Sequence, residues 1–323
     1  MNQLEQLILS TLVYYDIFDY PLTLVEIHRL LLRVKIQESG EIQDYDLCGI
    51  KDTLSSRGLR SSIRTRQGFF FLKGRDRIVK TRLTRYVLAK KKYDKAQKIV
   101  RILSHVPFTR AILACNSIAY NNTKEISDID LVIITKRGGV WWARLFSLLL
   151  LSAFHLRPGQ GGNKNKICLS VFIDEDNLNL SDLKMSPSDI DFVNWVANFY
   201  PLYDSHFVGG LAGGYYRKFW QENNVWLKKY LPHAEGVIQH TTRQIRHTSF
   251  AKIIFEYILL PFTFLARNVQ QQYFPHAIRE LANQDTRVRV EEGLLKFHVN
   301  DRRLQHLEEF VKRYENAIKA TSS

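Results

Sequence analysis

Apolar residues near the N-terminus recur at the three- and four-residue spacing of an amphipathic helix. Over residues 4–15 the apolar side chains of one face are Leu4, Leu7, Ile8, Leu12 and Tyr15. Pro21 interrupts this pattern. Thr23, with Glu26 three positions later, forms a capping box, which predicts that a second helix begins there.

A third helix and a β-hairpin are predicted further along. Residues 47–54 have helical apolar spacing, and either Asp44 or Asp46 can cap this helix. Residues 61–73 are typical of a hairpin, because two short β-prone runs flank a turn that contains Gly68. The N-terminal part of the chain therefore predicts three short helices followed by a hairpin.

Four arginines lie in this hairpin and just before it: Arg57, Arg60, Arg64 and Arg66. Three short helices and a hairpin resemble a winged-helix domain, which we place at residues 1–75. Winged helices put one helix in the DNA major groove and the hairpin tip on phosphates, so the resemblance implies that these arginines contact nucleic acid. Such domains also dock proteins, and the acidic third helix predicted here would read a major groove poorly.

Charge is distributed unevenly along the chain. Residues 57–101 hold sixteen Lys/Arg against two acidic residues, a net charge of +14, whereas residues 1–56 have a net charge of −5. A localised basic block favours nucleic acid or another polyanion as a partner. The alternative is a solvated helix with long side chains. Within this block, residues 76–104 predict a basic helical linker.

Two apolar segments in the middle of the chain predict strands, and the second follows a pair of acidic residues. Residues 111–114 and 131–134 are continuously apolar. Asp128 and Asp130 are two positions apart on the second strand, so both side chains point to the same face. Two carboxylates so placed repel each other unless a cation lies between them. Mg²⁺ suits this position, because it prefers oxygen ligands and keeps positions open for phosphates.

These residues resemble the signature of the nucleotidyltransferase fold of the DNA polymerase beta superfamily. That signature is a strand, a Gly-Ser or Gly-Gly turn that opens a helix, and two aspartates flanking an apolar residue on the next strand. Here the turn is Asn116-Ser117, and ten residues separate Ser117 from Asp128. The resemblance implies that Asn116 and Ser117 hold the triphosphate of an NTP. It also implies that Asp128 and Asp130 bind Mg²⁺ (or Mn²⁺) and carry the catalysis.

Two positions depart from the family pattern. Asn116 replaces the first glycine, although Asn tolerates left-handed backbone geometry better than most residues. The family also has a third carboxylate on a later strand, and the matching strand here, residues 166–173, has Ser170 as its interior polar residue. Asp174 and Asp176 at the end of this strand are the alternatives. A serine cannot act as a base at neutral pH without activation.

The expected fold class is α+β. A nucleotidyltransferase-type mixed sheet with helices over residues 105–200 is flanked by the N-terminal winged helix and by a helical C-terminal region over residues 201–323. The apolar stretches at 140–156 and 250–266 contain charged residues and fall short of a membrane span, so no membrane partner is expected. Three widely spaced cysteines and the absence of a signal-peptide pattern favour a cytoplasmic protein.

Three functional hypotheses follow from the sequence. The leading one is a Mg²⁺-dependent nucleotidyltransferase that transfers a nucleoside monophosphate from an NTP to a hydroxyl acceptor. The second is a catalytically weak or inactive regulator, in which the winged helix binds DNA and the transferase fold senses nucleotide. The third is a protein-docking scaffold. Catalytic turnover of NTP would favour the enzyme hypothesis, whereas nucleotide binding without turnover would favour the regulator hypothesis.

Overall fold

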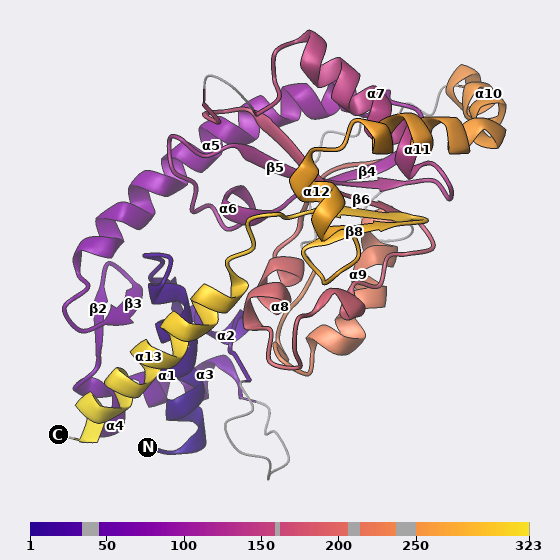
Figure 1. Ribbon diagram of the computed structural model, residues 1–323. Coiled ribbons are helices and arrows are strands. Elements are labelled where there is room, and N and C mark those ends of the chain that lie inside the picture. Colours follow the sequence, from indigo (N-terminus) through magenta and orange to yellow (C-terminus); the bar gives the residue numbers. More distant parts are fainter. Residues whose placement is uncertain (34–44, 159–161, 206–213, 237–249, 323) are drawn as a thin grey trace.

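A computed structural model describes residues 1–33, 45–158, 162–205, 214–236 and 250–322 of the chain (Figure 1). The fold is mixed α+β. Its N-terminal part contains short helices and a three-stranded sheet, formed by α1 (Gln3–Asp16), β1 (Leu22–Thr23), α2 (Leu24–Arg29), α3 (Leu47–Leu54), α4 (Arg57–Arg60), β2 (Ile63–Arg66) and β3 (Phe69–Leu72).

Local signals set the boundaries of these elements. The predicted capping box is confirmed at the start of α2, where Thr23 and Glu26 bond each other's backbone. Asp46 caps α3, and Asp44 lies outside the described residues. Gln67 and Gly68 both have positive φ (53° and 78°), as a two-residue hairpin turn requires. β1, which the pattern did not predict, pairs with β3 on the side away from β2.

A long helix connects this part to the rest of the molecule. α5 (Arg77–Leu103) has 27 residues and is therefore about 40 Å long. Its first half is tied to the N-terminal part by Arg82, which pairs with Glu26 at 2.6 Å, and by Arg85, which pairs with Asp19 at 3.2 Å. Part of the basic block thus forms intramolecular ion pairs.

A six-stranded mixed sheet forms the centre of the molecule. Its strands are β4 (Thr109–Ala114), β5 (Ile129–Thr135), β6 (Ile167–Asp174), β7 (Tyr200–Asp204), β8 (Val288–Glu291) and β9 (Leu294–Phe297), in the order β7-β4-β5-β6-β9-β8. Only β5 and β6 pair in parallel, which requires a crossover, and α7 (Val140–Ala153) provides it.

The other helices lie after β4 and in the C-terminal half. They are α6 (Asn116–Ala119), η1 (Ser181–Leu183), α8 (Ile190–Ala197), α9 (Tyr215–Leu227), α10 (Phe250–Leu259), η2 (Leu260–Phe262), α11 (Thr263–Gln272), α12 (His276–Leu281) and α13 (Arg303–Ser322).

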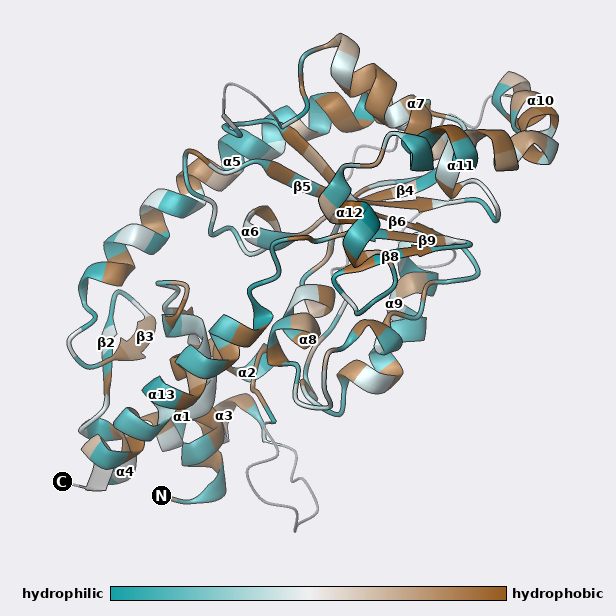
Figure 2. Cartoon of the chain, viewed as in Figure 1, coloured by the Kyte–Doolittle hydropathy of each residue, from teal (hydrophilic) through white to brown (hydrophobic). Residues whose placement is uncertain are grey.

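Both faces of the central sheet are buried. α8 and α9 cover one face, in a core that continues into α1, while α5, α7 and α11 cover the other. The strands of this sheet are accordingly largely apolar in Figure 2. Within the described ranges no helix combines the length and the apolar content needed to cross a membrane. All three cysteines are free thiols.

The C-terminal region, which the sequence predicts to be mostly helical, also contains a β-hairpin. The hairpin β8–β9 extends the central sheet beyond β6, with Gly293 in its turn at a φ of 85°. Each strand has only four residues, too few for alternation to stand out in the sequence. After this hairpin, α13 returns to the N-terminal part and packs against α1 and α8 (Figure 1).

Candidate functional site

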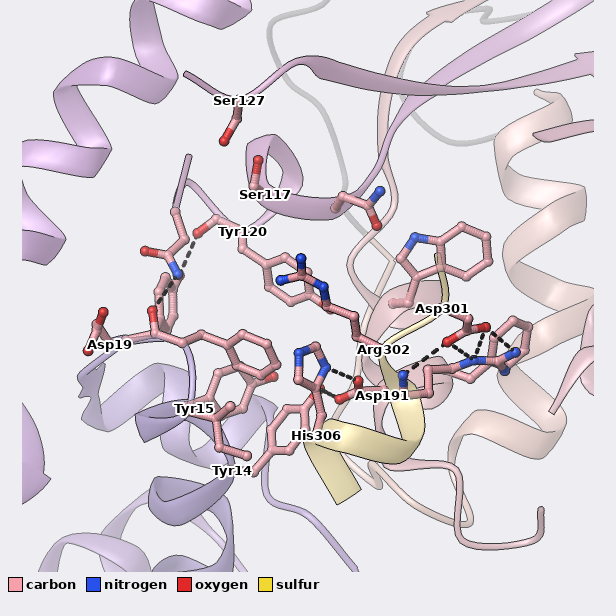
Figure 3. A pocket seen from close by; sticks show the side chains of 18 of the residues that line it. Tyr14, Tyr15, Asp19, Ser117, Tyr120, Ser127, Asp191, Asp301, Arg302 and His306 are labelled. Carbon is pink, nitrogen blue, oxygen red and sulfur yellow. Dashed lines mark hydrogen bonds and ion pairs between the residues drawn. The ribbon is translucent and has the colours of Figure 1, made fainter. Parts of the chain in front are cut away.

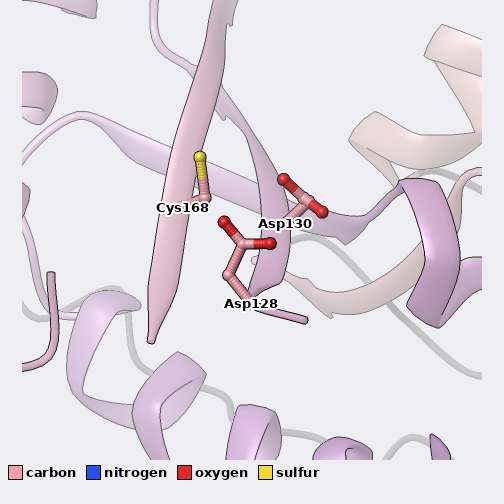
Figure 4. A group of neighbouring side chains, drawn as sticks. All are labelled: Asp128, Asp130 and Cys168. Atoms are coloured by element: carbon pink, nitrogen blue, oxygen red, sulfur yellow. The ribbon is translucent and has the colours of Figure 1, made fainter. Parts of the chain in front are cut away.

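Asp128, Asp130 and Cys168 form a cluster of potential metal ligands at one end of the parallel strand pair (Figure 4). One ligand atom from each residue lies within 4.8 Å of the others. Asp130 and Cys168 are register partners on β5 and β6, so their side chains point to the same face of the sheet. Two oxygen donors and one sulfur donor therefore converge here.

The two carboxylates are in an unfavourable electrostatic environment without a cation. Burial, followed by the neighbouring charge of Asp128, raises the pKa of Asp130 to about 7, and hydrogen bonds from Asn116 and Cys168 offset part of this shift. Burial also raises the pKa of Asp128. The Cys168 thiol stays protonated, because burial and the charge of Asp130 raise its pKa. A divalent cation would relieve this repulsion.

We expect Asp130→Asn to stabilise the metal-free protein at alkaline pH. A carboxylate whose pKa is raised on folding favours the folded state only while it is protonated, so the wild type loses stability as pH rises from about 4 through about 7. At pH 8 the variant should therefore gain on the order of 1–3 kcal/mol, and at pH 4 almost nothing. Thermal melts in EDTA from pH 4 to pH 9 measure this, and parallel pH profiles for the two proteins would contradict it.

The turn before α6 lies beside this cluster. Asn116 has a φ of 54°, in the left-handed region that glycine favours, and its side chain bonds Asp130. The backbone geometry of a glycine is thus retained at this position by an asparagine. Ser117 follows in the first turn of α6 and lines the neighbouring pocket.

Lys92 on α5 fixes the loop that leads to Asp128. Its ammonium group, only 3% exposed, donates hydrogen bonds to the backbone oxygens of Lys124 (2.6 Å) and Ser127 (2.5 Å). Burial lowers the pKa of Lys92, while the charges of Asp128 and Asp130 act in the opposite direction. This member of the basic block therefore positions the cluster and is not available to a polyanion.

The predicted third position needs correction, because Cys168 and not Ser170 faces Asp130. A register shift between Leu131 and Val132 displaces β6 at Ser170, whose buried hydroxyl has no hydrogen-bond partner among the residues that the structure describes. Asp174 pairs with Thr135 at the opposite end of β6, about 20 Å from Cys168. Its carboxylate bonds the loop around Asn177, so it does not provide the third ligand.

A pocket of about 610 Å³ lies beside the cluster (Figure 3). Segments far apart in the sequence form its wall: residues 14–20 at the end of α1, residues 116–127 around α6 and residues 296–306 from β9 into α13, together with Arg85 on α5 and residues 191–195 on α8. Asn116, Ser117 and Ser127 belong to this wall and adjoin the carboxylate pair. The N-terminal part thus contributes directly to the candidate site.

The pocket presents positive charge. Each carboxylate in its wall is bonded to a basic side chain, Asp19 to Arg85, Asp191 to His306 and Asp301 to Arg303. Lys124 and Arg302 also line the pocket, and their side chains have no bonding partner among the described residues. Arg302 extends from the start of α13 across the pocket toward Ser117 and Tyr120 (Figure 3).

Burial lowers the pKa of two further groups in the wall. Lys296 is 2% exposed and donates to the backbone oxygen of Thr286, and burial lowers its pKa to about 7. Burial, with the nearby Lys296, lowers the pKa of His298 to about 3, so this imidazole is neutral. The place of residues 296–306 in this wall depends on chain segments that meet only in the fold.

The four predicted nucleic-acid residues lie away from this pocket. Arg57, Arg60, Arg64 and Arg66 are all exposed on α4 and β2, and none forms an ion pair within the described ranges. Arg60 and Arg64 bond only nearby backbone oxygens. They form a basic surface at the end of the molecule opposite α10 and α11 (Figure 1).

Comparison with protein-family models, with curated proteins and with solved structures finds no match to this chain.

Proposed function

We propose that the protein is a metal-dependent nucleotidyltransferase that moves a nucleoside monophosphate from an NTP to a hydroxyl acceptor. The observation that carries this proposal is the half-buried carboxylate pair of Asp128 and Asp130, next to the left-handed Asn116, which lines a neighbouring cationic pocket together with Ser117 and Ser127. Both aspartates would bind Mg²⁺ or Mn²⁺, ions that prefer oxygen donors. When bound, the metal neutralises charge on the phosphates and on the attacking oxygen.

The pocket provides the binding part of the mechanism. Its volume of about 610 Å³ is within the usual range for small-molecule and nucleotide sites. Ser117 can donate a hydrogen bond to a phosphate oxygen, and Arg302 and Lys124 supply positive charge from two different segments of the wall. These groups would orient the triphosphate relative to the carboxylate pair, which lowers the barrier by positioning.

The chain offers no carboxylate where the family has its third one. Cys168 stands at that position, and its raised pKa keeps the thiol protonated, so it cannot accept the proton of the acceptor. Transfer would then depend on the metal and on positioning, without the roughly 10²–10⁴-fold that a general base contributes. We therefore expect slow turnover.

Incubation with labelled NTPs and Mg²⁺ or Mn²⁺ tests the proposal. Label that appears in protein, in RNA or in small molecules, with release of pyrophosphate, supports a nucleotidyltransferase. If NTP bound in a metal-dependent way but no nucleoside monophosphate were transferred to any of a broad set of acceptors, the regulator would be favoured instead.

We expect Arg302→Gln with Lys124→Gln to weaken NTP binding by at least about tenfold. Each substitution removes a charge-assisted contact to phosphate, and such contacts contribute about 1.5–3 kcal/mol. The apparent KM for NTP should rise more than kcat falls. Arg267→Gln with Lys312→Gln removes the same charge from exposed positions outside the pocket and serves as the control. Equal affinities for the two double variants would show that the pocket charge is not used.

The exposed arginines support a second candidate function, that of a nucleic-acid-binding, nucleotide-sensing regulator. Replacing Arg57, Arg60, Arg64 and Arg66 by glutamine should flatten the log–log salt dependence of DNA or RNA binding by several units. Each lost phosphate contact contributes about 0.7–0.9 to that slope. Fluorescence anisotropy across a salt series measures it, and unchanged affinity at every salt concentration would exclude this surface.

A further inference from the structure

α10 has its polar side chains turned toward the protein and its apolar ones toward solvent. Glu256, 1% exposed, forms a salt bridge of 2.6 Å with Arg110 on β4 and accepts a hydrogen bond from the backbone N–H of Phe108. Lys252, one turn earlier, donates to the backbone oxygens of Ser104 and Thr109. These contacts fix the rotation of the helix, so its opposite face must point outward.

α11 is anchored in the same way. Gln270 is buried, donates to the backbone oxygen of Trp141 and accepts a hydrogen bond from Arg144. The indole N–H of Trp142 donates to the backbone oxygen of Leu259, between the two helices. Polar contacts with α7 thus hold α11 and the end of α10 in place.

The outward face carries a set of ten large apolar side chains, with the exposed polar residues Arg267, Asn268 and Gln272 between those of α11. Its members are Phe250, Ile254, Phe255, Tyr257, Ile258, Phe262, Phe264, Leu265, Val269 and Tyr273. Phe250 is 77% exposed and Tyr273 is 81% exposed. Together the ten expose on the order of 1,000 Å², since a large side chain of this kind offers about 150–250 Å². A monomer's largest apolar patch is usually about 300–600 Å².

We infer that this α10–α11 face binds the same face of a second copy of the chain. Its area matches the roughly 800 Å² per partner that a stable interface buries. A two-fold dimer uses one self-complementary patch, and two helix pairs that meet in this way bury their apolar stripes as in a four-helix bundle. Helices that lie on membranes carry Lys and Arg on a polar face that is open to solvent. Here the polar face holds Lys252, Glu256 and Gln270, and all three side chains bond other parts of the protein.

Sedimentation equilibrium of the full chain tests the inference. The wild type should have twice the 37.8 kDa mass of one chain at micromolar concentration. Ile258→Asp with Val269→Asp should return it to the mass of one chain, because both side chains are exposed in the monomer and the substitutions place charges in the interface. Circular dichroism should show an unchanged helical signal.

Val25→Asp with Val225→Asp is the matched control, since these valines are equally exposed but lie on α2 and α9. This control should remain dimeric. A wild type that stays at the mass of one chain up to about 100 µM would overturn the inference. Binding of that monomer to vesicles of phosphatidylcholine and phosphatidylglycerol, lost in Ile258→Asp with Val269→Asp, would identify lipid as the occupant instead. A dimer that persists in the α10–α11 variant would place the interface elsewhere.

Discussion

Replacing Asp128 and Asp130 together by asparagine should abolish the thermal stabilisation of the protein by Mg²⁺-NTP and lower nucleotidyl transfer by about 10³-fold or more. Asparagine has nearly the same volume as aspartate but lacks the charge that holds a divalent cation. Loss of the metal removes several kcal/mol of charge stabilisation at the reacting phosphate, and each 1.36 kcal/mol is a factor of ten in rate. Thermal shift with and without Mg²⁺-NTP and a labelled-NTP transfer assay provide the two measurements.

Asp176→Asn is the matched control for this experiment. Asp176 lies just beyond the far end of β6, where it pairs with Arg137 at 3.2 Å, and its loss should change neither readout. If the double variant were stabilised by Mg²⁺-NTP as much as the wild type, the carboxylate pair would not be the metal site. If Asp176→Asn abolished transfer, a carboxylate outside the cluster would take part in the chemistry.

Breaking the buried pair of Arg110 and Glu256 should have the largest effect on stability. Arg110→Met leaves the Glu256 carboxylate buried without its partner, which costs about 3–5 kcal/mol of the free energy of unfolding. The guanidinium of Arg110 also keeps the pKa of Glu256 below its usual value against the effect of burial. A carboxylate with a lowered pKa stabilises the fold above its unfolded pKa of about 4.5, so the wild type should lose this advantage as pH falls below that value.

Urea unfolding at pH 7 and at pH 4 measures this effect. The double variant Arg110→Met with Glu256→Leu should recover much of the loss, because no unpaired charge remains. Arg289→Met breaks the partly exposed pair with Glu291 and should cost no more than about 1 kcal/mol. If Arg110→Met lowered the free energy of unfolding by as little as Arg289→Met, water would have to reach the Glu256 carboxylate.

The sequence predicts those parts of the fold that are encoded by neighbouring residues. The capping box of Thr23 and Glu26, the turn at Gly68 and the apolar run of β5 each depend on a few consecutive positions, and each lies where expected. The proximity of Asp128 and Asp130 agrees with their two-residue spacing, although Asp128 lies one residue before β5. The left-handed geometry of Asn116 matches a position where the resemblance would have a glycine.

Features that depend on register or on distant contacts could not be predicted. The sequence predicts Ser170 as the interior polar residue of β6, whereas Asp130 pairs with Cys168 and a register shift after Leu169 leaves Ser170 without a partner position on β5. The pocket forms only where Tyr14, Ser117 and Arg302 come together in the fold, and the residues next to each of them in the sequence do not indicate this contact. The outward apolar face of α10 depends on Arg110, which lies about 150 positions away and selects which side of the helix turns inward.

The packing of α13 on α1 has a consequence for synthesis on the ribosome. Arg313 of α13 pairs with Asp16 at the end of α1, and Phe310 contacts Tyr14 in the same helix. At about 5–20 residues per second, α1 is translated many seconds before the segment that covers it. A nascent chain that ends before residue 303 can already contain the carboxylate pair on β5, but its pocket wall is incomplete. The pocket wall is therefore complete only after nearly the whole described chain has left the exit tunnel.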